Sequence, residues 1–193
     1  MAKARAWRLL AAGLVWAAMA PAPAGAREDH EPRGGRQAYQ GTVQDFVDIN
    51  QLFARYDFTI DNGDATGWAK VFTPDGVFRD PSWCAIGREQ LAGVVSSEKH
   101  GMGSDRRAHH VPTIGPINYL DRDHATVHST VMVVTEKGAG HPDGGISITG
   151  SYDDTLVRRD GHWLFAYRLV HRPSNKPAVP CAAKPPYDTG EGP

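Results

Sequence analysis

Apolar residues recur every three or four positions from Val43 to Asn62, which predicts an amphipathic helix. Asn62-Gly63 favours the end of this helix, and Asp64 can cap a second, shorter one. The apolar stripe of the first helix comprises Phe46, Ile49, Phe53, Tyr56 and Ile60. On the second helix, the residues expected to face inward are Trp68, Val71 and Phe72.

The next segment predicts a turn, a short strand, a loop and a third helix. Thr73-Pro74-Asp75-Gly76 has the residues of a turn, because proline presets φ and glycine accepts a positive φ. A strand is expected at Val77–Arg79, followed by the loop Asp80–Gly87. The helix expected at Arg88–Lys99 has Leu91, Val94 and Val95 as its core face.

The second half of the domain reads as a meander of long strands. The expected strands are Arg107–Leu120, His124–Glu136, Ile146–Arg159 and His162–Arg172. Prolines in the first strand indicate an edge or bulged strand, and Asp160-Gly161 is a hairpin dipeptide. Helices followed by antiparallel strands indicate an α+β fold. We expect a cone-shaped, strongly curved antiparallel sheet wrapped around the N-terminal helices, with a pocket inside.

The two ends of the chain differ from this domain. Residues 1–26 contain a basic start, an apolar run from Leu9 to Ala20 and a small-residue cleavage site, which are typical of a signal peptide cleaved after Ala26. We therefore expect a secreted or periplasmic protein with no membrane span after cleavage. Residues 27–42 predict a flexible arm, 43–172 the domain, and 173–193 a proline-rich irregular tail.

Charge and cysteine content narrow the possible partners. The formal charge is −1, and removal of the signal peptide leaves 18 basic and 22 acidic residues, or about −4. Acids and bases are mixed without a basic stripe, so a nucleic-acid partner is not expected. Cys84 and Cys181 are the two cysteines. In an oxidising compartment they could form one disulfide or remain as two free thiols.

Four segments resemble the SnoaL-like group of the nuclear transport factor 2-like superfamily, which includes scytalone dehydratase and ketosteroid isomerase. They are RYDFTIDNGDATGWAKVFTPDGVF, AHHVPTIGPI, ATVHSTVMVV and GSYDDTLVRRDGHWLFAYRLVHR. The resemblance covers about Val43 to Arg172. It implies an α+β cone with an internal pocket, often dimeric through the outer face of the sheet. We therefore expect a homo-oligomer.

The resemblance also implies site residues. The dehydratases of the group use a Tyr-Asp pair on the first helix and histidines on facing strands. Tyr56 and Asp57 stand at the place of that pair, His110 matches the first histidine, and His128 is the candidate for the second. Where scytalone dehydratase has a serine and an asparagine near its substrate, this chain has Gly150 and Tyr152, which leaves the substrate open.

Two alternatives remain for the acid–base pair. Asp57 borders the buried stripe of its helix, where it could orient a histidine or pair with Arg55 or Arg107 for structure alone. His128 shares one strand face with His124 and Thr130, and Val127, Val131 and Val133 occupy the other. Alternation does not decide which face lines the pocket, and analogy favours His128.

Other residues have structural or binding interpretations. His109 and His110 must point to opposite faces of a strand, as must Asp153 and Asp154. Asp57, His110 and His128 have the residue types of a metal triad, but no local ligand spacing supports one, so neither metal nor cofactor is expected. The proposed substrate-binding residues are Tyr152, Trp83 and Tyr167, whereas Trp68 and Trp163 are simplest as core residues.

The sequence thus predicts an exported, cofactor-independent lyase of the dehydratase type. Its substrate would be a small, largely apolar hydroxylated ring compound, with Asp57 orienting His110 and with Tyr56 and His128 at the departing oxygen. The alternatives are an isomerase, a formaldehyde-releasing lyase with the same residues, or a non-catalytic binding module.

A disulfide between Cys84 and Cys181 is a further hypothesis. The loop before the third helix lies near the pocket mouth in the fold that the resemblance implies. The bond would tie the proline-rich tail across the domain and narrow that mouth.

Overall fold

Helix α1 (Val43–Asp61) starts at a capping box in the computed structural model, which describes residues 38–96, 108–136, 143–174 and 178–183. The Thr42 side chain accepts a hydrogen bond from the Asp45 backbone N–H, and the Asp45 carboxylate accepts one from the Thr42 backbone in return. This reciprocal arrangement satisfies two amides that the first turn would otherwise leave unpaired.

Asp45 also connects the helix to the sheet. Its buried carboxylate accepts hydrogen bonds from the side chains of Tyr39, Arg158 and Trp163. Burial favours the neutral acid, but the hydrogen bonds from Tyr39 and Thr42 outweigh it and hold the pKa of Asp45 well below its usual range. The end of the expected flexible arm is thereby fixed to the domain. The expected signal peptide, residues 1–26, and residues 27–37 lie outside the described residues.

The apolar stripe of α1 is confirmed with one exception. Ile49, Phe53, Tyr56 and Ile60 are buried, together with Leu52, whereas Phe46 is 57% exposed. In the first turn the inward position belongs to Asp45, because its hydrogen bonds require it to face the sheet. The residues predicted to face inward on the second and third helices are all buried, namely Trp68, Val71, Phe72, Leu91, Val94 and Val95.

Six strands form one open, curved sheet in the order β2-β1-β6-β5-β4-β3. The elements after α1 are α2 (Ala65–Lys70), β1 (Phe72–Asp80), β2 (Trp83–Ile86), α3 (Gly87–Ser96), β3 (Ala108–Tyr119), β4 (His124–Thr135), β5 (Gly145–Arg159) and β6 (His162–His171). The α+β class is therefore confirmed. The antiparallel meander of the four long strands is confirmed as well, whereas the first strand, β1, joins the sheet by pairing with β6 in parallel.

Two local assignments also differ from the expectations. The predicted turn Thr73–Gly76 lies inside β1, where the register with β6 shifts between Phe72 and Val77. Proline and glycine therefore mark an irregular strand segment rather than a turn. The predicted loop Asp80–Gly87 contains β2, which pairs with β1 through Arg79↔Cys84 and Asp80↔Trp83. The Asp160-Gly161 hairpin is confirmed, with φ of 51° and 79°.

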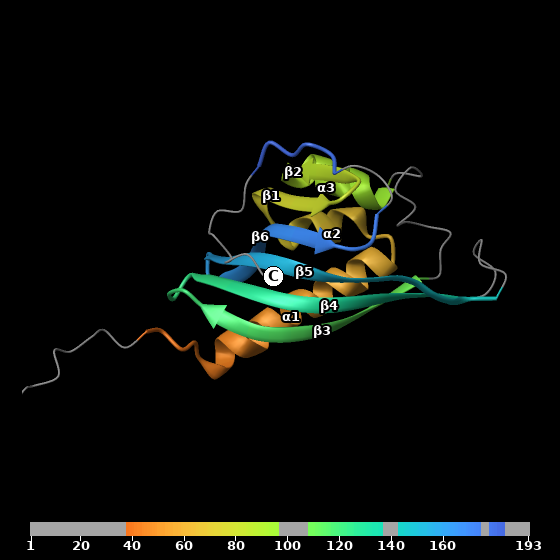
Figure 1. Cartoon of the computed structure of the whole chain (residues 1–193). Helices are drawn as coiled ribbons and strands as arrows, with labels where there is room; N and C mark the ends of the chain where they lie inside the picture. The colour runs from red at the N-terminus through yellow and green to blue at the C-terminus, as the bar shows by residue number, and fades with distance from the viewer. Residues whose placement is uncertain (1–37, 97–107, 137–142, 175–177, 184–193) are drawn as a thin grey trace, which may run out of the picture. The chain divides into compact units, whose positions relative to one another are not determined.

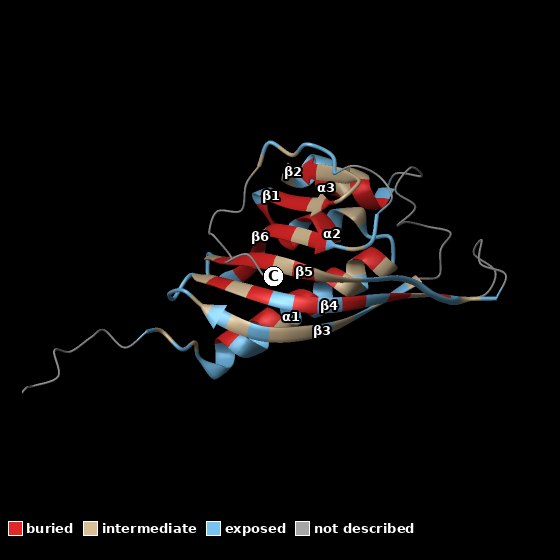
Figure 2. Ribbon diagram, in the orientation of Figure 1, coloured by how far each residue is buried: buried red, intermediate tan, exposed pale blue. Residues whose placement is uncertain are grey.

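Curvature of the sheet separates an inner face from an outer face. Helix α1 lies against the inner face (Figure 1), and buried residues alternate with exposed ones along β4 (Figure 2). A bulge interrupts the pairing of β3 with β4 between Ile114 and Ile117. At Gly115 an added Cβ would lie 2.3 Å from the His128 carbonyl oxygen. Only glycine allows the two strands to approach this closely.

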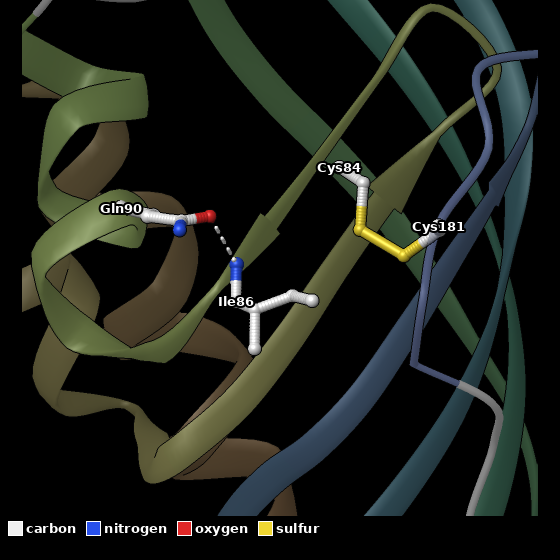
Figure 3. Close-up of a disulfide and its surroundings, with 4 residues drawn as sticks. All are labelled: Cys84, Ile86, Gln90 and Cys181. Carbon is white, nitrogen blue, oxygen red and sulfur yellow. Dashed lines mark hydrogen bonds between the residues drawn. A yellow bond between two sulfur atoms is a disulfide. The ribbon is translucent and has the colours of Figure 1, made fainter.

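The Cys84–Cys181 disulfide is present, with Cα atoms 5.8 Å apart (Figure 3). It joins β2 to the tail, and the Val179 N–H donates to the Pro81 carbonyl close by. The Gln90 side chain also accepts from the Ile86 N–H, connecting β2 with α3 (Figure 3). The tail is irregular where it is described, as its prolines predicted.

Removal of this disulfide should destabilise the domain. The bonded cysteines are 97 residues apart, and the chain-entropy model gives a ceiling of about 4.7 kcal/mol for a loop near this length. Ordering of the tail offsets part of this gain. We expect Cys181→Ser to lower the free energy of unfolding by about 2–4 kcal/mol in urea titrations.

The wild-type protein under reducing conditions should match the variant, and reductant should not affect the variant. Equal stability of the oxidised wild type and the variant would contradict the prediction.

Candidate active site

A cavity of about 150 Å³ lies between the end of α1 and the inner face of the sheet. Its walls are largely apolar and aromatic, and a few polar side chains converge on it. The apolar and aromatic side chains include Phe78, Trp83, Val131, Val133, Ile148, Tyr152 and Val170. The charged and titratable side chains are Asp61, Asp80, His110 and Arg172. This combination is typical of a small-molecule site.

His110 is held in this cavity by Asp61, the last residue of α1. Its Nδ1 lies 2.6 Å from Asp61 Oδ1, and its backbone N–H donates to Asp61 Oδ2 at 3.0 Å. The two side chains are 9% and 15% exposed. Because the carboxylate accepts from Nδ1, we assign the proton of the neutral ring to Nδ1. Nε2 then carries the lone pair of a general base.

The predicted partner of His110 was Asp57, and that assignment is wrong by one helical turn. Asp57 and Asp61 are four residues apart and therefore lie on the same face of α1. Both are near the histidine, but strand β3 places His110 beside the last turn. The spacing of the two carboxylates was visible in the sequence, whereas the position of β3 along the helix was not.

Asp57 remains close to the site as a half-buried acid. Burial raises its pKa to about 7, although the charges of Arg168 and His110 lower it, and that of Asp61 raises it. Its carboxyl group has no hydrogen-bond partner among the described residues, and it does not line the cavity. Neither proposed structural partner is observed, since Arg107 lies outside the described ranges and Arg55 forms no ion pair there. Asp57 can therefore exchange a proton near neutral pH.

A buried ion pair between Arg168 and Asp154 lies near enough to Asp57 to affect its pKa. The Arg168 Nε and Nη2 donate to the two oxygens of Asp154 at 2.7 and 2.8 Å. The guanidinium also lies over the rings of Tyr56 and Tyr152, at 4.1 and 4.2 Å from their centroids. Burial lowers the pKa of Arg168, but Asp154 more than offsets it, so the arginine stays charged.

The two tyrosines have different access to the cavity. Tyr152 lines it, and burial, opposed by the charge of Arg168, raises its pKa, so the phenol stays protonated. Tyr56 is 1% exposed, does not line the cavity, and its hydroxyl has no partner in the described structure. Burial raises the pKa of Tyr56 as well. Tyr152 is therefore better placed than Tyr56 to donate a hydrogen bond to a ligand.

His128 does not face the cavity, contrary to the expectation. Its side chain is 59% exposed, and its Nδ1 lies 2.7 Å from Asp153 Oδ1 on the outer face. The same carboxylate contacts His171 through Oδ2 at 2.6 Å. The valines of β4 point inward instead, and strand alternation then forces His128 outward. Asp153 and Asp154 lie on opposite faces, as predicted.

Of the two remaining residues predicted to bind substrate, one lines the cavity and the other is buried elsewhere. Trp83 lines the cavity and stacks on Phe78, with ring centroids 4.8 Å apart. Tyr167 is buried but does not line the cavity. One ion pair of the cavity lining was not predicted from the sequence, namely that in which Arg172 donates to Asp80 at 2.6 and 2.7 Å.

The tail does not border the cavity where it is described, contrary to the expectation of a narrowed mouth. Cys84 follows Trp83 on β2 and therefore points away from the inner face.

No group of three metal-ligating side chains occurs within the described ranges. The triad considered from residue types does not assemble, because His128 faces outward while Asp57 and His110 lie on the inner side.

The curved open sheet, the helix layer on its inner face and the cavity between them are the architecture of a SnoaL-like protein of the nuclear transport factor 2-like superfamily. The chain belongs to the SnoaL-like domain family, whose pattern matches residues 41–169. A search of curated proteins found no match.

Solved structures agree with this assignment. Rv3472 of Mycobacterium tuberculosis, described as of unknown function, is 32% identical, with coverage of 66% of this chain and 71% of that chain and a TM-score of 0.59. A Catenulispora acidiphila protein in complex with S-DNPA is 27% identical, with coverage of 68% and 95% and a TM-score of 0.59.

A candidate scytalone dehydratase from Novosphingobium aromaticivorans is 23% identical, with coverage of 74% and 97% and a TM-score of 0.60. At this identity the likeness concerns the fold alone.

Replacement of Asp57 by asparagine should stabilise the protein in a pH-dependent manner. The pKa of Asp57 is about 7 in the folded state, against the ordinary aspartate value of 3.8. Between these values the folded state binds the proton more tightly, so wild-type stability falls as pH rises from 4 to 7. The gain in Asp57→Asn should be absent near pH 4 and level off above pH 7, at no more than about 4 kcal/mol.

Urea unfolding at several pH values measures this gain, with the exposed Asp75→Asn as the matched control. A gain that is equal at pH 4 and pH 8 would show that the carboxyl of Asp57 does not titrate in this range.

Proposed function

We propose that this protein is an exported, cofactor-independent lyase of the dehydratase type, acting on a small hydroxylated ring compound. The observation that carries the proposal is His110, whose ring Nδ1 is held by Asp61 Oδ1 and whose backbone N–H donates to Asp61 Oδ2, beside a small, largely apolar cavity. A surface or core histidine needs no such orientation, whereas a general base does.

In the proposed elimination, His110 Nε2 removes a proton from the carbon next to the one that bears the hydroxyl. The C–H electron pair becomes the second bond of the alkene, and the C–O bond breaks. Tyr152 donates a hydrogen bond to the departing oxygen, and the proton held by His110 converts the leaving hydroxide to water. Asp61 stabilises the imidazolium formed between these steps. The atoms and charges balance without a further reactant.

The size of the cavity supports a monocyclic substrate. A cavity of about 150 Å³ lined by apolar side chains is large enough for a benzene ring. Trp83 and Phe78 supply aromatic surface against which a flat ring can pack. Arg172, which keeps donor capacity beside Asp80, can bind a carbonyl or hydroxyl at the far end of the ring.

An isomerase is the second candidate, because the oriented His110 serves that reaction equally well. Its Nε2 can return the proton that it removed to a different carbon of the ring, which moves a double bond without loss of water. Turnover in deuterated solvent separates the two reactions by mass spectrometry. A dehydratase product loses 18 mass units relative to substrate, whereas an isomerised product keeps the substrate mass apart from exchanged deuterium.

Export and assembly also belong to the proposal. The Cys84–Cys181 bond fits an oxidising compartment, and the outer face of the sheet is the surface proposed for a homo-oligomer. Within the described ranges, no helix is both long and apolar enough to cross a bilayer. N-terminal sequencing of the protein released from its native cell tests cleavage after Ala26.

His110→Gln and Asp61→Asn should each reduce turnover by about 10²- to 10⁴-fold, because the first removes the base and the second its orientation. A panel of monocyclic hydroxylated compounds provides the assay.

His128→Gln is the matched control, since that histidine lies on the outer face and should leave kcat/KM unchanged. Full activity in His110→Gln would refute the proposed base.

Binding should be limited by ring size. We expect phenol-sized probes to bind in the cavity, and three-ring phenols to be excluded. Val133→Phe should fill the cavity and abolish probe binding, whereas Met132→Phe, on the outward side of β4, should not.

NMR titration measures these affinities without any turnover. Equal binding of one-ring and three-ring probes would contradict the size limit while leaving the acid–base assignment intact.

A further inference from the structure

A second concave surface lies on the other side of α1 from the candidate active site. It is a cleft of about 820 Å³ formed by α1, α2, the first part of β1, the start of α3 and the β5–β6 hairpin. It shares no lining residue with the active-site cavity. Arg55 and Thr59 line it, and a spacing of two residues places them about 200° around the helix from Asp57 and Asp61.

Four basic side chains converge on this cleft, namely Arg55, Lys70, Arg88 and Arg159, together with His162. Asp75 and Asp160 are the acidic residues of the lining. The cleft thus has a formal charge of +2 with neutral histidine, in a chain whose formal charge is −1.

These basic groups lack carboxylate partners. In the described parts of the chain, none of the four forms an ion pair, and Arg88 donates only to the Phe72 carbonyl at 3.2 Å. By contrast, Arg158, Arg168 and Arg172 each pair with an aspartate. Unneutralised cations in a concave surface concentrate positive potential and attract anions.

We propose that this cleft binds a compact phosphorylated ligand. Arginine forks match the oxygens of a phosphate, and three of the four cations are arginines. The volume lies within the usual range of small-molecule sites. A nucleic-acid strand fits less well, because no tyrosine, phenylalanine or tryptophan lines the cleft for base stacking, and the two aspartates oppose an extended polyanion.

Isothermal titration with pyrophosphate at constant ionic strength tests the proposal. We expect saturable binding to one site per chain, weakened at least about tenfold in Arg55→Glu/Arg159→Glu, since charge-assisted hydrogen bonds are lost. Thr130→Glu/Met132→Glu, at two exposed positions on the outer face of β4, changes the formal charge by −2 away from the cleft, half the change made by the double Arg→Glu variant, and should leave the affinity within about twofold.

Two further comparisons distinguish a phosphate site from a carboxylate site and from general charge attraction. Citrate should bind more weakly than pyrophosphate, and a citrate site with no pyrophosphate binding would overturn the phosphate assignment. A loss in Thr130→Glu/Met132→Glu equal to that in Arg55→Gln/Arg159→Gln, which changes the charge by the same −2, would indicate general charge attraction and also overturn it, as would the absence of saturable binding.

Arg55→Gln/Arg159→Gln tests the same site with a milder change, and thermal melts verify folding. Binding of phenol in the active-site cavity should persist in all variants, so the two proposals succeed or fail separately.

Discussion

The buried contact between Arg168 and Asp154 is the interaction on which the interior depends. A guanidinium and a carboxylate removed from water destabilise a core unless each is fully paired, and here the pairing is bidentate. The rings of Phe53, Tyr56, Tyr152 and Phe165 enclose the guanidinium. Loss of either partner would leave an unpaired buried charge. The pair therefore fixes β5 against β6 and fixes the aromatic rings between them and α1.

This charged core also shapes the chemistry of the site. Arg168 favours ionisation of Asp57, and burial opposes it more strongly, which brings the pKa to about 7. Asp61, one turn further and at the end of the helix, orients His110 instead. Two carboxyl groups on one helix face thus have different roles, because one is desolvated and the other is hydrogen-bonded by the histidine.

The two faces of a strand in this sheet contact different surroundings, the cavity on the inner side and polar groups on the outer side. Along β4 the inward valines close the cavity, and His128 joins Asp153 and His171 on the outer face. Helix α1 is divided in the same way, with Asp57 and Asp61 toward the cavity and Arg55 toward the basic cleft. A single helix therefore separates two surfaces of opposite character, which permits two ligand sites in one small domain.

Much of the fold follows from the sequence alone, since periodicity, caps and turn residues act over a few positions. The helices, the four long strands, the Asp160-Gly161 hairpin and the α+β class were predictable in this way, and residue types with the resemblance indicated His110, Tyr152 and Trp83. Tertiary structure decided the rest. The choice of Asp61 over Asp57 depends on where β3 meets α1, and the orientation of His128 depends on which face of β4 is covered. The Arg172–Asp80 pair and the basic cleft join residues far apart in the chain. Local patterns cannot encode such contacts, because they arise only when the sheet curves around the helix.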